Sequence, residues 1–213
     1  MTASISPPQK NWTPDDRIPP PNQRHTPAEV LAALQNALGP ACLAARMAPA
    51  SADPAVASDR HLWLDLTPDG LRPAVQTLLS IHFPHFIVIA AEDCGATIRL
   101  PYFFRIYHGP RHAEILITLT VCLPKDNPVV PSICDLIPAA LISEREKQEM
   151  MGVIVQNIPD TRRMFLPDDF PEGVYPWRKD ETAPKPPLVR TLWDTNRPVV
   201  PPPPPPAAEP PAP

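Results

Sequence analysis

The sequence predicts an α+β fold, in which helices pack on a small mixed or antiparallel sheet and an extended C-terminal arm follows. Two helical patterns with recognisable ends and three runs of β-branched and aromatic residues predict the domain. Proline delimits it, because 7 of the 36 prolines lie in residues 1–27 and 13 lie in residues 181–213. Proline-dense segments lack backbone donors and cannot build a core. We therefore expect a disordered N-terminal segment over 1–25, the α+β domain over 26–158, the arm over 159–184 and a disordered Pro-rich tail over 185–213.

The first half of the domain predicts two helices and a strand. Thr26-Pro27-Ala28-Glu29 forms a capping box with proline at the first helical position, and leucines follow at helical spacing until Gly39-Pro40. His61–Leu66 is typical of a strand. Residues 71–79 predict a second helix, provided that Pro73 lies in its first turn.

The centre of the domain predicts three strands. Residues 85–91, 98–107 and 113–123 are rich in branched and aromatic side chains, and residues 108–111 supply a turn between the last two. In the third run, apolar residues alternate with Thr118, Thr120 and Cys122. This alternation predicts a half-buried antiparallel strand.

Two further helices are expected: a short one from Ser132, capped by Asp135, and a longer one from Pro138 to Met151. The longer helix carries Glu144-Arg145-Glu146 beside apolar residues. These charges can form a solvated face with intrahelical pairs to Lys147 or Gln148. They can equally dock on a partner or on the chain's own basic residues at 162–163 and 178–179, and the spacing leaves both interpretations open.

Composition and motifs exclude several classes of function. The net charge of −4 argues against a nucleic-acid binder. A phosphate-binding glycine loop, a G-x-S-x-G elbow and an H-E-x-x-H motif are all absent from the sequence. His108 and His112 straddle a turn, and His82 and His85 have no neighbouring carboxylate, so we expect no metal site at these histidines.

The four cysteines, at 42, 94, 122 and 134, form no C-x-x-C pair, which predicts buried reduced thiols without a metal or iron–sulfur cluster. The first ten residues lack the pattern of a secretory signal, and the apolar runs are far shorter than the roughly 20 residues of a spanning helix. We therefore expect a reduced, cytoplasmic protein without a membrane span.

Residues 158–180 combine four prolines with large apolar side chains at 164–166, 170, 174, 175 and 177. The prolines exclude a regular helix or a central strand. The apolar content is too high for a tail left in water, and aromatic anchors beside arginines are typical of a segment that lies on another protein.

The sequence between residues 128 and 180 resembles the 30 kDa subunit of respiratory complex I, the NADH:quinone oxidoreductase. The resemblance rests on Glu144-Arg145-Glu146, Gly152, Pro159-Asp160 with Arg162-Arg163, and Arg178-Lys179-Asp180. Lys147–Met151 departs from the respiratory pattern. Leu166-Pro167-Asp168-Asp169-Phe170-Pro171-Glu172-Gly173-Val174-Tyr175-Pro176 resembles instead the related subunits of energy-converting nickel–iron hydrogenases and formate hydrogenlyases, which favours the hydrogenase-type branch.

The resemblance implies a cofactor-free peripheral subunit without an active site of its own. It would dock on the large catalytic (49 kDa-like) and small iron–sulfur subunits of an oxidoreductase complex at the cytoplasmic face of the cell membrane. Nickel–iron and iron–sulfur centres or quinone would belong to those partner subunits. The residues expected at the partner interface are Glu144, Arg145, Glu146, Asp160, Arg162, Arg163, Phe165, Tyr175, Trp177, Arg178 and Lys179.

Two other classes of function remain as alternatives. The run Pro201–Pro206 could make the chain an adaptor whose polyproline tail binds aromatic grooves. A free-standing enzyme that uses Glu144, Glu146 or a histidine is the weakest alternative, because no catalytic pair is visible.

Overall fold

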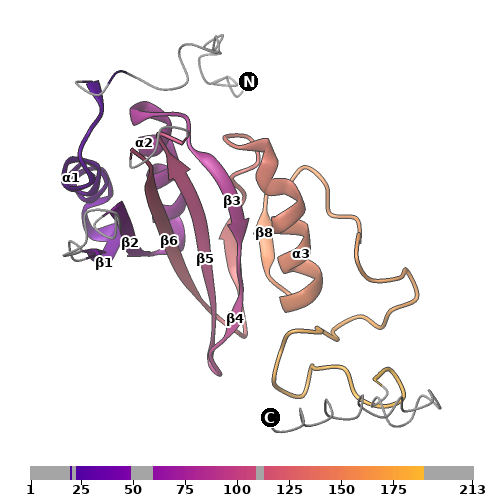
Figure 1. Cartoon of the computed structure of the whole chain (residues 1–213). Coiled ribbons are helices and arrows are strands. Elements are labelled where there is room, and N and C mark those ends of the chain that lie inside the picture. The colour runs from indigo at the N-terminus through magenta and orange to yellow at the C-terminus, as the bar shows by residue number, and fades with distance from the viewer. Residues whose placement is uncertain (1–19, 21–22, 49–59, 109–112, 190–213) are drawn as a thin grey trace, which may run out of the picture. The chain divides into compact units, whose positions relative to one another are not determined.

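A computed structural model describes residues 20, 23–48, 60–108 and 113–189 (Figure 1). The chain up to Ala183 belongs to one compact unit, and Pro184 begins a second. The first unit has helices and strands in mixed order, so the α+β expectation is confirmed. Its elements are α1 Pro27–Leu38, β1 Cys42–Met47, β2 His61–Leu66, α2 Leu71–Ile81, β3 His85–Ile89, β4 Glu92–Asp93, β5 Thr97–Ile106, β6 Ile115–Pro124, β7 Val129–Pro131, α3 Leu141–Met151 and β8 Ile154–Gln156.

The main sheet has the strand order β1-β2-β6-β5-β3, with the short β4 pairing with β5. Its longest ladder joins β5 to β6 antiparallel, from Thr97 opposite Pro124 to Ile106 opposite Ile115. The sheet is mixed because β2 runs parallel to β6 while all its other strand pairs are antiparallel. A second, two-stranded parallel sheet joins β7 to β8.

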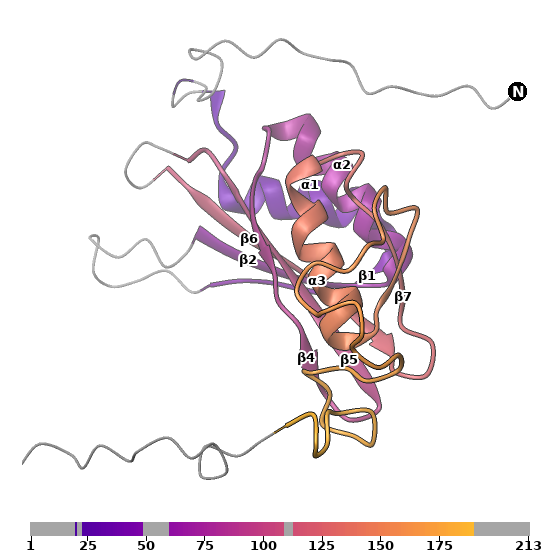
Figure 2. The same ribbon diagram turned by 90° about the vertical axis from the view of Figure 1, so that its right-hand side faces the viewer.

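The core lies on one face of the main sheet. The register places Leu62, Ile117 and Phe104 in one row across β2, β6 and β5, and all three side chains are fully buried. Helices α1 and α2 pack against each other and on this face, whereas α3 lies beside the edge strand β3 (Figures 1 and 2). The alternation of apolar residues in β5 and β6 thus decides which face the helices cover.

The expected starts of α1 and α2 are confirmed. The Thr26 hydroxyl accepts a hydrogen bond from the Glu29 backbone N–H, and the Glu29 carboxylate accepts one from the Thr26 N–H. Pro73 is the third residue of α2 and therefore lies in its first turn. There the missing proline N–H has no intrahelical partner to lose.

The prediction of a half-buried third strand was wrong in the middle of β6. Thr118 and Thr120 point away from the helices, yet they are only 3% and 2% exposed. Because β2 is the parallel neighbour of β6, it places His61 and Trp63 beside these threonines, and His61 Nε2 lies 2.8 Å from the Thr118 hydroxyl. The sequence pattern does not reveal that β6 is a central strand.

The short helix expected from Ser132 was also wrong. Residues 134–136 form a turn, and α3 begins at Leu141 after a 3₁₀ segment at Pro138–Ala140. The Ser132 hydroxyl accepts a hydrogen bond from the Cys134 N–H, but the Asp135 carboxylate pairs with Arg72 instead of capping a helix. Strands β1, β4, β7 and β8 were not expected from the sequence.

The cysteines depart in part from the expected burial. All four are free thiols, but only Cys134 is buried, while Cys94 and Cys122 are exposed. Within the described ranges, no helix is long and apolar enough to cross a membrane. His112, most of the N-terminal segment and the run Pro201–Pro206 lie outside the described residues.

Candidate functional site

The residues expected at a partner interface gather where the C-terminal arm passes α3. We use "the arm" for residues 159–183, which have no helix or strand and run beside α3 (Figure 2). The side chains of α3 reach both the sheet domain and the arm. The first charged residue of α3, Glu144, binds the domain, whereas Arg145, Lys147 and Glu149 contact the arm.

Glu144 faces the domain and is only 1% exposed. Its carboxylate accepts hydrogen bonds from the Ser132 hydroxyl at 2.6 Å, the Ile133 N–H at 2.8 Å and the Cys134 thiol at 2.9 Å. Burial, followed by the bond to Glu144, raises the pKa of Cys134 to about 12. The thiol is therefore protonated near neutral pH, and Glu144 organises the turn before α3 rather than an intrahelical pair.

Arg145 faces the arm. Its guanidinium donates hydrogen bonds to the backbone carbonyl of Arg162 at 2.6 and 2.9 Å and to that of Arg163 at 3.1 Å. It also lies 3.3 Å from the Asp160 carboxylate. Arg162 hydrogen-bonds the same carboxylate and, with Arg145, holds the pKa of Asp160 well below its usual range.

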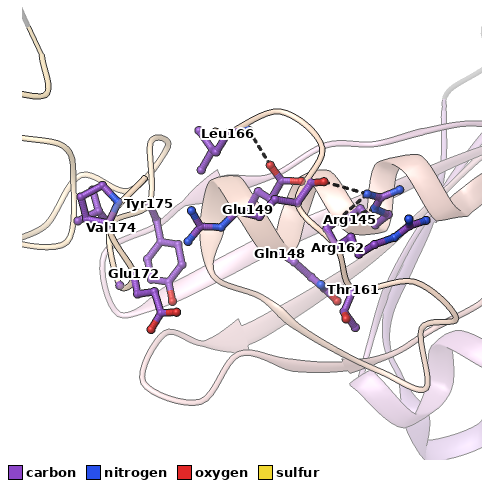
Figure 3. A pocket seen from close by; sticks show the side chains of 12 residues that line it. Arg145, Gln148, Glu149, Thr161, Arg162, Leu166, Glu172, Val174 and Tyr175 are labelled. Atoms are coloured by element: carbon purple, nitrogen blue, oxygen red, sulfur yellow. Dashed lines mark hydrogen bonds between the residues drawn. The ribbon is translucent and has the colours of Figure 1, made fainter. Parts of the chain in front are cut away.

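Glu149 lies one turn after Arg145 and binds the next residues of the arm. Its carboxylate accepts hydrogen bonds from the backbone N–H groups of Met164 at 2.5 Å, Phe165 at 2.8 Å and Leu166 at 2.9 Å. The residue is 9% exposed, and Figure 3 shows it beside Leu166. Glu149 is missing from the residues expected at the interface, although its spacing of four from Arg145 was a usable signal.

Lys147 and Trp177 join α3 to the far part of the arm. Lys147 is 2% exposed, pairs with the Glu146 carboxylate and lies 4.9 Å from the centre of the Trp177 ring. The Trp177 backbone N–H donates to the carbonyl of Met150 at 3.0 Å, yet the residue is 42% exposed. Trp177 thus rests on α3 with one part of its surface and leaves the rest free.

Gly152 ends α3 and allows Tyr175 to approach. It has a φ of +66°, and a Cβ atom there would lie 2.7 Å from Tyr175 Cε1. Arg178 covers the Tyr175 ring at 4.5 Å and donates to the Met151 carbonyl at 2.8 Å. Glycine is therefore required both for the left-handed backbone and for the ring contact.

The end of the arm is attached to the sheet by Asp93 of β4. The Asp93 carboxylate accepts a hydrogen bond from the Lys179 N–H at 2.7 Å and pairs with Lys125 at 2.5 Å. Lys125 also lies 3.0 Å from Asp180. Lys125 first, and then the Lys179 N–H, lower the pKa of Asp93 to about 2.

A cavity of about 350 Å³ lies between α3 and the arm (Figure 3). Arg163 lines it, and its guanidinium donates to the carbonyls of Pro167 at 3.2 Å and Phe170 at 2.6 Å. The charged groups around the cavity thus shape the arm itself. Among the residues that the structure describes, no cluster of three or more His, Cys, Asp or Glu side chains is placed to hold a metal ion.

The eleven interface candidates lie on α3 or on the arm, but they differ in how much of each side chain is exposed. Glu144 is used inside the domain, whereas Phe165 is 51% exposed and the Arg162 side chain is 84% exposed. Which of them contact a partner stays a prediction.

Known proteins resemble this chain in sequence. The family model of the respiratory-chain NADH dehydrogenase 30 Kd subunit matches residues 64–187. Membrane-bound hydrogenase subunit beta of Pyrococcus furiosus is 41% identical over 107 residues, which make up 50% of this chain and 61% of that protein.

Formate hydrogenlyase subunit 5 of Escherichia coli is 45% identical over 64 residues, which make up 30% of this chain but only 11% of that protein. This chain therefore spans less than two thirds of either relative. A solved chain of the membrane-bound sulfane sulfur reductase, an archaeal respiratory membrane complex, has a TM-score of 0.57 at 21% identity, covering 71% of this chain and 83% of that one. At this identity the likeness shows the fold alone.

Proposed function

Because this chain belongs to the respiratory-chain NADH dehydrogenase 30 Kd subunit family, we propose that it is a peripheral subunit of a membrane-bound oxidoreductase complex. The complex would be an energy-converting hydrogenase or an NADH:quinone oxidoreductase. The names of the relatives support this role, since they are subunits of a membrane-bound hydrogenase and a formate hydrogenlyase. The family expected from the motifs of residues 128–180 is thereby confirmed.

The proposed partners are a large catalytic subunit and a small iron–sulfur subunit at the cytoplasmic face of the membrane. The Escherichia coli relative supports a large partner, because the segment that matches this chain is a small part of a much longer polypeptide. Segments joined in one protein and separate in another commonly occupy neighbouring positions. The redox centres, whether nickel–iron, iron–sulfur or quinone, would lie in the partner subunits.

The cysteine pattern supports a role without a metal in this chain, because the four cysteines form no C-x-x-C pair. Docking, rather than electron transfer, is the role proposed for the chain.

The exposure of the arm is the observation that carries this proposal. Phe165 and Trp177 are 51% and 42% exposed, although α3 holds the segments that carry them. A large aromatic side chain fixed on a rigid support is typical of an interface anchor. The arm therefore offers a docking surface.

Purification of the tagged chain from its own cells tests the proposal. The wild-type chain should bring a large subunit and an iron–sulfur subunit, identified by mass spectrometry and by the metal content of the complex. Trp177→Ala should weaken this assembly, because truncating an interface anchor costs roughly 2 to 4 kcal/mol of binding. Arg163→Ala should weaken it as well, because the guanidinium that holds the Pro167 and Phe170 carbonyls, and with them the shape of the arm, is lost. Leu43→Ala is the matched control, since Leu43 is 65% exposed on β1 at the other edge of the sheet.

Two outcomes would contradict the proposal. Full assembly of the Arg163→Ala/Trp177→Ala double variant would show that the arm does not dock. Partners that bind only through residues 198–213 would favour the polyproline adaptor instead.

A further inference from the structure

Much of the backbone of the arm between residues 162 and 170 is hydrogen-bonded inside the chain. Arg145 donates to two of its carbonyls, and Glu149 accepts from three consecutive N–H groups. We propose that α3 fixes the arm in its docking shape before a partner arrives, and that the partner recognises the side chain of Phe165 rather than the arm backbone. This inference rests on the proposed function.

Arg145 and Glu149 together bind both the carbonyl groups and the N–H groups of the arm backbone. Their spacing of four places them on one side of α3, about one turn apart. The Arg145 guanidinium donates hydrogen bonds to the carbonyls of Arg162 and Arg163, and the Glu149 carboxylate accepts them from the N–H groups that follow. Bonds in which one group is ionised are shorter and stronger than neutral ones, so this pair fixes both the path and the direction of the arm.

Further backbone groups of the segment are bonded within the arm itself. The carbonyls of Pro167 and Phe170 accept from Arg163, and the Phe170 N–H donates to Pro167. Proline has no N–H, so Pro167 and Pro171 offer no donor. A partner strand cannot pair with the N–H groups of residues 164–166, because all three already donate to Glu149.

The side chain of Phe165 remains available. Glu149 binds its N–H at 2.8 Å while 51% of the residue stays exposed, so the ring projects from an immobilised backbone. We infer that the partner surface provides an apolar pocket for this ring. An arm that is ordered in advance loses less conformational entropy on binding than one that folds on its partner. Glu149 is thus a positioning residue for the interface.

Hydrogen exchange on the isolated full chain tests the fixed arm. Glu149→Gln removes the charge at constant shape, and we expect the amides of residues 164–166 to exchange about tenfold faster or more. Glu172→Gln is the matched control, because Glu172 is exposed and lines the same cavity. The amides of β5 and β6 report whether the domain stays folded, and they should not change in either variant.

Binding to membranes tests the recognition of Phe165. Washed membranes from source cells that lack only this chain are mixed with purified full-length variants, and the bound fraction is measured. Phe165→Ala should bind about tenfold more weakly with unchanged exchange at residues 164–166. Glu149→Gln should show both weaker binding and faster exchange, and Glu172→Gln neither.

The outcomes separate the inference from the proposed function. If the amides of residues 164–166 exchange as slowly in Glu149→Gln as in the wild type, then Glu149 does not fix the arm. If Phe165→Ala binds the membranes as well as the wild type, the partner does not recognise the Phe165 side chain. The same holds if Glu149→Gln binds as well as the wild type although its arm amides exchange faster. In both cases the proposed subunit role stands. Failure of the wild-type chain to bind these membranes would overturn the proposed function and the docking role of the arm together.

Discussion

The main sheet and the arm are stabilised by different kinds of interaction. Across β5 and β6, Phe104, Leu119 and their neighbours are buried by apolar contact with α1 and α2. Along the arm, Arg145 and Glu149 supply charged hydrogen bonds to backbone groups. Apolar burial is shared among many side chains, whereas the position of the arm depends on a few directional bonds. The arm can therefore be altered by single substitutions that leave the sheet folded.

The largest effect is expected in the sheet. Phe104→Ala removes a fully buried ring that packs at 5.7 Å from Phe86, and should lower the free energy of unfolding by about 3 to 5 kcal/mol. Phe165→Ala, the same change in the arm, should stay within about 0.5 kcal/mol of wild type, because this ring is exposed. Denaturant titration measures both, and equal losses would show that the arm belongs to the core.

Gly152→Ala should have the next largest effect and lower the free energy of unfolding by about 2 to 4 kcal/mol. The variant combines a left-handed backbone with a clash against Tyr175. Gly95→Ala separates the two causes, because Gly95 has a φ of +83° and no atom within 4 Å of the added Cβ. We expect that control to cost about 1 kcal/mol. Thermal unfolding compares them, and equal costs would mean that the Tyr175 contact contributes nothing.

The bond between Asp93 and the arm should make stability depend on acid. The pKa of Asp93 is lowered from 3.8 to about 2, so its contribution is present above pH 3.8 and is lost as the pH falls toward 2. The loss should be about 2 kcal/mol. The stability difference between wild type and Asp93→Asn should shrink by this amount between about pH 6 and about pH 2. A constant difference would contradict the pairing with Lys125.

The smallest effect is expected from deletion of residues 198–213, which lie outside the described residues. The segment is rich in proline and contributes no large apolar side chain beyond two valines. The melting temperature should therefore be nearly unchanged. A loss of several degrees in a thermal melt would show that this segment packs on the domain.

The sequence predicted those helices and strands whose formation depends on residues close together in the chain. The capping box at Thr26 and the alternation in residues 115–123 both led to the right element. The burial of Thr118 could not be predicted, because it depends on β2, which lies far from β6 in the sequence. The spacing of four from Arg145 indicated that Glu149 shares its helix face, but its partners are distant backbone amides, which no residue type in the sequence identifies.

The hydrogen bond from Lys179 to Asp93 spans 86 residues of sequence. A ribosome completes β4 and β5 long before it reaches Lys179, so the sheet has time to assemble while the arm is still being made. Asp93 lies on β4, which pairs with β5, so the end of the arm binds a residue that the sheet itself positions. We expect this closure of the arm to come late in biogenesis. A complex that accepts only the closed arm would exclude immature copies of this chain from assembly.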